Sequence, residues 1–126
     1  TARMKTIEDL TLYQKARAFR IQISEIANRL PSSERFRLVD QMIRSSRSIT
    51  AQIAEGHGRF HYKENVQYCR IARGSLEETQ DHLNVAFDEG YISDQEVKRM
   101  LQSKHEISRM LNGYINFLKE AASRSE

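Results

Sequence analysis

Residues 34–55, ERFRLVDQMIRSSRSITAQIAE, carry a strongly periodic pattern of apolar and small side chains. These side chains recur at intervals of three and four residues, which is the period of an amphipathic α-helix. One stripe contains Phe36, Val39, Ile43, Ser46 and Ile53, and a neighbouring stripe contains Leu38, Met42, Ser45 and Ile49. Together the stripes span about half a turn, which is wider than a surface helix requires. The stretch therefore predicts a long helix with apolar surface to bury beyond one neighbour.

The boundaries of this helix and of the one before it are marked by helix-stopping and capping residues. An apolar stripe that begins at Leu12 ends at Pro31, where a helix should stop. Ser32 and Ser33 are good N-cap residues for the following helix. The segment 56–58, GHG, places glycine where a helix commonly ends.

Two more helical segments follow. The third runs over about residues 63–89 and closes at Gly90, and the fourth opens with a capping box at residues 93–96, SDQE. Its apolar stripe continues to Ala121. Four helices of about 20 residues with short connections predict an all-α fold, an antiparallel up-down-up-down four-helix bundle, with residues 1–126 as one domain.

Composition narrows the functional classes. The 126 residues are 39% hydrophobic and 29% charged, and 20 basic residues against 17 acidic ones give a net charge of +3. This balance permits an anionic partner without requiring one. The single cysteine, Cys69, cannot form an internal disulfide, which suits a reducing compartment. No apolar run approaches the roughly 18 residues that span a bilayer, and the N-terminus has no signal-peptide pattern, so we expect a cytoplasmic protein with no membrane contact.

The second and third predicted helices each carry a further stripe with a mixture of charged and small residues. These stripes contain Arg37, Gln41, Arg44, Ser48 and Glu55 on the second helix, and Ile71, Gly74, Ser75, Glu78, His82 and Val85 on the third. Glycine within a helix costs up to about 1 kcal/mol, so its presence is better explained if another backbone approaches there. In an antiparallel hairpin Arg44 lies level with Glu78. We therefore predict that the two meet across a close helix contact, within a subunit or between two, and we expect self-association; the alternative is that both are solvated.

The segment 41–56, QMIRSSRSITAQIAEG, resembles the signature of a bacterial family of four-helix-bundle proteins encoded by intervening sequences in large-subunit ribosomal RNA genes. The family pattern is similar to Q-L-R-R-A-A-x-S-I-x-x-N-I-A-E-G, followed by G-R and later by I-A-x-G-S-L-x-E and G-Y-[LI]. The matching positions here are Gln41, Arg44, Ser48, Ile49, Ile53, Ala54, Glu55, Gly56, Gly58, Arg59, Ile71, Ala72, Gly74, Ser75, Leu76, Glu78, Gly90, Tyr91 and Ile92.

The chain departs from the pattern at Ile43, Thr50 and Gln52, where arginine, proline and asparagine are common. The resemblance implies a cytosolic four-helix bundle, a ring-like homo-oligomer (a pentamer), a nucleic-acid role and no established catalytic activity. The matching positions include those that the helical pattern predicts as contacts between helices.

Basic residues on the second and third helices are the candidate nucleic-acid-binding surface. They are Arg37, Arg44 and Arg47 on the second helix, Lys63, Arg70 and Arg73 on the third, and Arg59 between them, near Phe60 and Tyr62. Cations with adjacent aromatic rings can neutralise phosphates and stack bases of RNA or DNA. Asp40, Glu64 and Glu77 are interspersed, so a solvated, ion-paired surface is the alternative, and a scaffold for an unidentified protein partner fits as well.

Enzymatic and metal chemistry have little support. His57 and His61 are four residues apart and Glu55 could be a third ligand, but the histidines straddle a glycine-containing loop. Since the chain also has no cysteine pair and no H-E-x-x-H motif, no metal or other cofactor is predicted. Arg99 and His105 have the spacing of some four-helix RNases of the toxin and defence type, but Met100 stands where those enzymes carry a polar residue. Without a nucleophile elbow, P-loop or dinucleotide motif, no catalytic residue and no enzyme activity are predicted.

Overall fold

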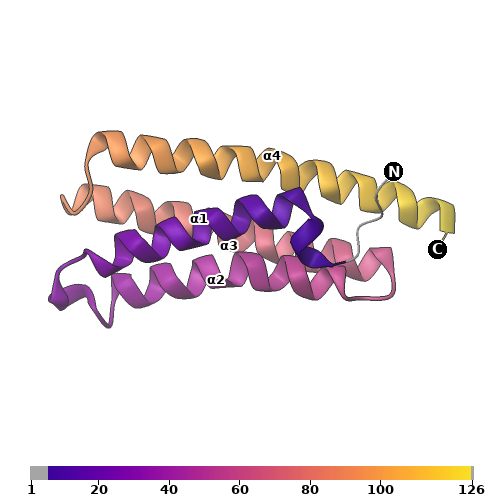
Figure 1. The fold of residues 1–126 in the computed structure, drawn as a ribbon, viewed down its shortest axis with the longest axis horizontal. Coiled ribbons are helices and arrows are strands. Elements are labelled where there is room, and N and C mark those ends of the chain that lie inside the picture. The colour runs from indigo at the N-terminus through magenta and orange to yellow at the C-terminus, as the bar shows by residue number, and fades with distance from the viewer. Residues whose placement is uncertain (1–5, 126) are drawn as a thin grey trace.

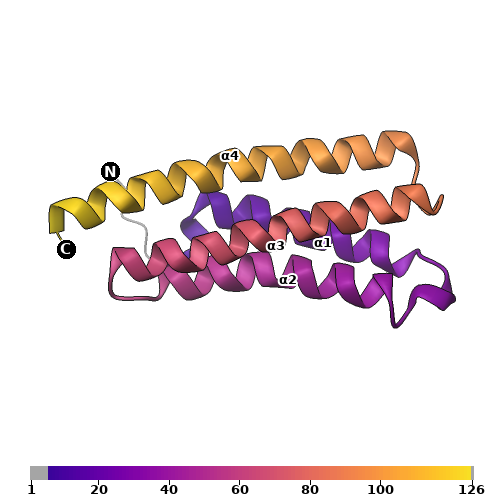
Figure 2. The same ribbon diagram turned by 180° about the vertical axis from the view of Figure 1, so that it is seen from behind.

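The computed structural model describes residues 6–125, and over this range the chain forms α-helices and short 3₁₀-helices (η) with no strand. The elements are η1 (Ile7–Asp9), α1 (Thr11–Asn28), η2 (Ser32–Glu34), α2 (Leu38–His57), α3 (Tyr62–Asp88) and α4 (Asp94–Ser125). The four α-helices lie side by side along one long axis (Figures 1 and 2). The predicted all-α four-helix bundle is confirmed.

Contacts between α2 and α3 show that these two helices run in opposite directions. The Ser45 and Thr79 hydroxyls lie 2.8 Å apart, and the Ser75 hydroxyl donates to Ser48 Oγ over 2.7 Å. As residue numbers rise along α2, those of the facing residues fall along α3. Figures 1 and 2 show the same alternation for each consecutive pair of helices.

The core is built from the apolar stripes of all four helices. The largest fully buried apolar side chains are Phe19, Ile23, Met42, Ile49, Ile53, Leu76, Leu83, Met100, Ile107, Leu111 and Leu118. Lys104 also lies on the buried stripe of α4. Its Nζ lies 2.6 Å from Glu77 Oε1, so the ammonium group is paired at the edge of the core while the aliphatic part of the side chain is buried. Phe36 was expected on a buried stripe, but its side chain is 84% exposed because α2 begins only at Leu38.

The start of α2 differs from the sequence prediction. The N-cap position is Arg37 and not a serine, since Ser32 and Ser33 form η2 together with Glu34. Glu34 takes over the capping role: its Oε1 accepts a 3.5 Å hydrogen bond from the Leu38 N–H. Its Oε2 accepts one of 2.7 Å from the Tyr91 hydroxyl. A carboxylate favours a helix N-terminus, because the first backbone N–H groups have no partner within the helix.

Glycines at the ends of α2 and α3 have different roles. Gly90 follows α3 with φ of +79°, and the N–H groups of Gly90 and Tyr91 donate back to Phe87 and Ala86 as in a Schellman motif. Gly58 is the C-cap of α2, as the sequence predicts for the segment 56–58, whereas Gly56 lies within the last turn of the helix. A Cβ at Gly56 would lie 2.4 Å from Asn65 Oδ1, so its absence allows α3 to approach α2 closely.

The fourth helix begins as the sequence indicates. The Glu96 N–H donates to Ser93 Oγ over 3.0 Å, which confirms Ser93 as an N-cap. The C-terminal turns of α4 lie at the same end of the bundle as the α2–α3 connection and extend past the other helices (Figures 1 and 2). Within the described range no helix is both long enough and apolar enough to cross a membrane.

Candidate functional site

The outer contact between α2 and α3 forms a shallow, polar depression of about 410 Å³, which we call the α2–α3 seam. It is lined by Gln41, Arg44, Ser45, Ser48, Ser75, Glu78 and His82. The Ser48–Ser75 and Ser45–Thr79 hydrogen bonds form its floor. The seam brings together most of the residues that the sequence predicts as structural or interface positions.

The predicted Arg44–Glu78 pair does not form within the subunit. Arg44 Nη1 lies 3.4 Å from Asp40 Oδ2, and Glu78 Oε2 lies 3.0 Å from His82 Nε2. Each side chain therefore pairs with a neighbour one turn away on its own helix, where the backbone already holds the two groups close together. Both residues line the seam, so a contact between subunits remains a prediction.

The glycine in the seam region has free space around it. A Cβ added at Gly74 would meet no atom within 4 Å, so no other part of this subunit needs a glycine there. The expected close approach at Gly74 is thus wrong within the chain, and the tight α2–α3 contact lies at Gly56. On the same side of α3, Ile71 one turn before Gly74 and Val85 about three turns after it have 50% and 37% of their surface exposed. Glu55, the last predicted interface position on α2, instead pairs with Arg59 at 3.3 Å.

The seven basic residues that the sequence predicts do not gather on one face. Arg37 is the exposed N-cap of α2, at the opposite end of the bundle from Arg59. Arg44 lies in the α2–α3 seam, and Arg47 faces α1, in a depression that also contains Arg20 and Glu25. The other three, Lys63, Arg70 and Arg73, are on the flank of α3 that faces α4.

Arg59 is engaged by its neighbours at the α2–α3 connection. Its guanidinium pairs with Glu55 at 3.3 Å and Glu64 at 4.0 Å, and it lies 4.8 Å from the centre of the Tyr68 ring, whose hydroxyl it also contacts. These contacts neutralise the charge and hold the connection in place. Arg59 is therefore less available to a phosphate than the sequence suggests.

Between the start of α3 and the end of α4 lies a groove of about 420 Å³, the α3–α4 groove. It is lined by Lys63, Val66, Gln67 and Arg70 of α3 and by Lys119, Ala122 and Ser123 of α4. Three of these residues are cationic and none is acidic. Arg70 and Lys119 form no ion pair with any residue in the described range, and Arg73 lies beyond Arg70 with its guanidinium donating to Asn112 Oδ1 over 2.9 Å.

Sequence reasoning missed Lys119. It considered basic residues only on the second and third helices, whereas the groove has one wall from the fourth. The signal was present in the topology: an antiparallel α3–α4 hairpin that turns at Gly90 sets the end of α4 beside the start of α3. Combining that register with the charges of both helices would have found the groove.

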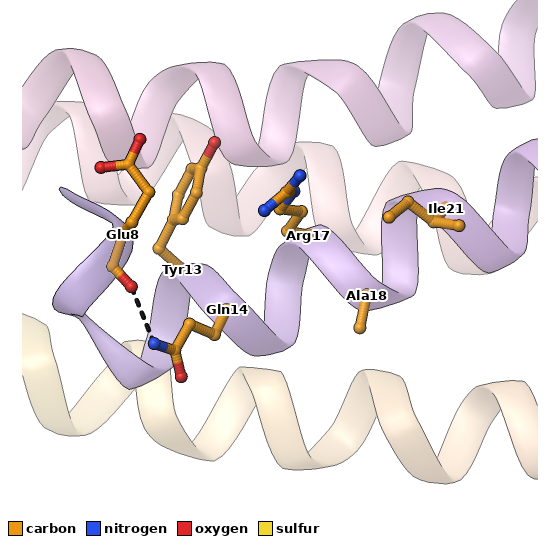
Figure 3. Close-up of a pocket in the computed structure, with 6 residues that line it drawn as sticks. All are labelled: Glu8, Tyr13, Gln14, Arg17, Ala18 and Ile21. Carbon is orange, nitrogen blue, oxygen red and sulfur yellow. Dashed lines mark hydrogen bonds between the residues drawn. The ribbon is translucent and has the colours of Figure 1, made fainter.

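A smaller depression of about 250 Å³ lies on η1 and the outer surface of α1. Its lining residues are Glu8, Tyr13, Gln14, Arg17, Ala18 and Ile21 (Figure 3). Gln14 Nε2 donates to the Glu8 carbonyl over 2.7 Å, which joins η1 to α1. A hydrogen bond from the Thr6 side chain holds the pKa of the Glu8 carboxyl below its usual range, and Arg17 contributes in the same direction. The Glu8 carboxylate and the Arg17 guanidinium are the two charged groups that line this depression, and their charges cancel. The depression therefore has no strong preference for an anion.

The residues considered for catalysis or metal binding do not converge. Arg99 pairs with Glu96 at 3.6 Å, and His105, six positions further along α4, points about 120° away around the helix. Residues 6–125 contain no group of three or more side chains placed to hold a metal ion. Cys69 is fully buried and its thiol donates to Asn65 Oδ1 over 3.4 Å. Burial raises the pKa of this thiol to about 11, so it is a poor nucleophile.

Comparisons with known proteins agree with this architecture. A family model described as 23S rRNA-intervening sequence protein matches residues 8–113. The crystal structure of a protein with unknown function from the S23 ribosomal protein family of Bacteroides thetaiotaomicron is similar with a TM-score of 0.77 and 23% identity, over 83% of this chain and 98% of that one. A comparison with curated proteins finds no match. Since the matched region covers most of the chain, including every motif of the family pattern between residues 41 and 92, the chain belongs to the 23S rRNA-intervening sequence protein family.

Proposed function

We propose that the protein is a non-enzymatic, self-associating helical bundle of the cytoplasm that binds RNA or DNA through the α3–α4 groove. One observation carries this proposal: Lys63, Arg70 and Lys119 line one groove that contains no carboxylate. Several arginines elsewhere on the surface are instead ion-paired, as Arg44 is with Asp40 and Arg99 is with Glu96.

The chemistry of the groove suits phosphate. Lys63 and Arg70 line the groove from α3 and Lys119 lines it from α4, so a sugar-phosphate backbone lying along it can contact cations of both helices. Lysine and arginine that displace counterions from that backbone provide affinity without reading its sequence. Arg73, which extends the row of cations along α3, can contact a further phosphate.

Self-association would use the α2–α3 seam. The space beside Gly74 and the partly exposed Ile71 and Val85 offer room and apolar surface to another subunit. In such a contact Arg44 of one subunit can reach Glu78 of the next. A ring of this kind, for which we propose a pentamer, would repeat the α3–α4 groove and raise the overall affinity for a long nucleic acid.

Fluorescence anisotropy with labelled RNA and DNA, from low to near-physiological salt, tests the proposal. Wild-type protein should bind with a logarithmic affinity that falls linearly with the logarithm of salt concentration. Arg70→Gln should weaken binding and reduce that slope by about one. Arg47→Gln is the control, because Arg47 is also an exposed arginine but lies between α1 and α2. Absence of binding at low salt would exclude the nucleic-acid role.

A protein scaffold is the second candidate, and the exposed aromatic residues favour it. Phe36 and Phe117 have 84% and 56% of their surface exposed, and exposed aromatic rings of this kind can anchor a protein partner. A scaffold should bind its partner equally well at low and moderate salt and should tolerate Arg70→Gln. The RNase alternative predicts that RNA is cut and that His105→Ala prevents cutting; we expect RNA to stay intact in the same incubations.

A further inference from the structure

Phe60 combines high exposure with a position next to the cationic groove. Its side chain is 91% exposed, and it lies in the α2–α3 connection, three residues before Lys63. The ring makes a perpendicular contact with the neighbouring His61 ring, at 4.9 Å between centroids and an interplanar angle of 87°. This perpendicular arrangement leaves ring surface of Phe60 open to solvent.

Phe60 and the α3–α4 groove lie at the same end of the bundle. Figures 1 and 2 show the α2–α3 connection and the C-terminal turns of α4, which contain Lys119, at that end. A strand whose phosphates follow the groove from Arg70 past Lys63 leaves the bundle close to Phe60. An unpaired base of that strand would then lie at the end of the bundle that carries the exposed Phe60 ring.

We propose that the ligand of the α3–α4 groove is a single-stranded nucleic acid with an unpaired base stacked on Phe60. This inference rests on the proposed function and identifies the form of nucleic acid. An exposed ring can stack only on a base whose face is accessible, and the bases of a duplex are already stacked on each other. A duplex would leave the Phe60 ring in water. Phosphates and base faces are common to RNA and DNA, so the same geometry serves both.

The chain supplies a matched control in Phe36. Phe36 is also a phenylalanine with very high exposure, and it precedes α2 just as Phe60 precedes α3. It lies at the opposite end of the bundle, away from the groove (Figure 1). Neither side chain contributes to the core, so replacing either by alanine should leave the fold intact, which circular dichroism can verify.

The experiment measures fluorescence anisotropy with three labelled probes. The first is an RNA single strand of about 12 nucleotides that cannot pair with itself. The second is a DNA strand of the same sequence, and the third is the RNA strand annealed to its complement. We expect the single strands to bind more tightly than the duplex. Phe60→Ala should lower single-strand affinity roughly tenfold without changing the salt slope. Phe60→Trp should retain binding, and Phe36→Ala should match the wild type.

The outcomes separate this inference from the proposed function. If Phe60→Ala binds single strands as tightly as the wild type, or the duplex binds at least as well as the single strands, the inference is wrong. The proposed function survives that result provided that Arg70→Gln still weakens binding. If no probe binds at low salt, both fail. A preference for RNA over DNA strands would support the inference and add a contact to the 2′-hydroxyl.

Discussion

The two outer flanks of α3 differ in how their charges are balanced. On the flank toward α2, Glu78 pairs with His82 and Arg44 of the facing helix pairs with Asp40. On the flank toward α4, the cations Arg70 and Lys119 line a groove without any carboxylate. One helix thus contributes to a surface that mixes acidic and basic side chains and to a groove whose charged residues are all cationic. The difference shows that a basic residue becomes a candidate phosphate ligand only when the neighbouring helices leave its charge unmatched.

Reversing the charges of the groove should have the largest effect. With Arg70→Glu and Lys119→Glu together, two attractions to phosphate become repulsions, and we expect affinity for nucleic acid to fall on the order of 100-fold, about 2.7 kcal/mol. Arg44→Glu in the α2–α3 seam is the control and should change little the affinity for an oligonucleotide short enough to occupy a single groove. Anisotropy at constant salt measures both. Equal losses in the two variants would mean that the two flanks do not differ in function.

Filling the tight α2–α3 contact should have the next largest effect. Gly56→Ala places a Cβ 2.4 Å from Asn65 Oδ1 and 2.9 Å from Tyr68 Cβ, so α2 and α3 must move apart. We expect the free energy of unfolding to fall by about 2 kcal/mol, measured by urea denaturation. An unchanged or raised stability would show that the contact near Gly56 is not tight.

Gly74 should respond in the opposite way. Gly74→Ala meets nothing within 4 Å in the subunit and improves helix propensity, so it should stabilise the isolated subunit by up to about 1 kcal/mol. If subunits meet at the α2–α3 seam, the larger Gly74→Leu should lower the oligomer mass in sedimentation experiments. Gly113→Leu is the control, since Gly113 on α4 is equally open. If Gly74→Leu left the oligomer mass unchanged, the proposed subunit contact would not lie at the α2–α3 seam.

Cys69 lies on the buried side of α3, between its two flanks, and should make the free energy of unfolding depend slightly on pH. Burial raises the pKa of its thiol to about 11 from an ordinary value of 9.0. Between these pH values the unfolded chain releases the thiol proton while the folded chain keeps it. This contribution to stability is therefore complete below pH 9 and is lost as pH rises toward 11. Urea denaturation of Cys69→Ser and wild type should show a smaller pH dependence in the variant, and a thiol reagent should react slowly with folded wild type at pH 8.

The sequence determined the helices and much of their buried surface. Stripes such as Leu12, Ala16 and Phe19 follow the helical period, which depends only on residues close together in the chain, and Ser93 and Gly90 mark ends through local hydrogen bonds and φ. The same locality explains the failures at Phe36 and Ser32, because the start of α2 depends on Glu34 and its distant partner Tyr91.

Only the tertiary structure decided which charges and which glycines matter. The sequence identified Arg70 as a candidate ligand, but Lys119 joins it through the register of α3 against α4. It likewise could not distinguish Gly56, which faces Asn65 closely, from Gly74, which faces open space. Periodicity assigns a residue to a face of its own helix. The distance to a facing helix and the charge carried there depend on how segments far apart in sequence pack together.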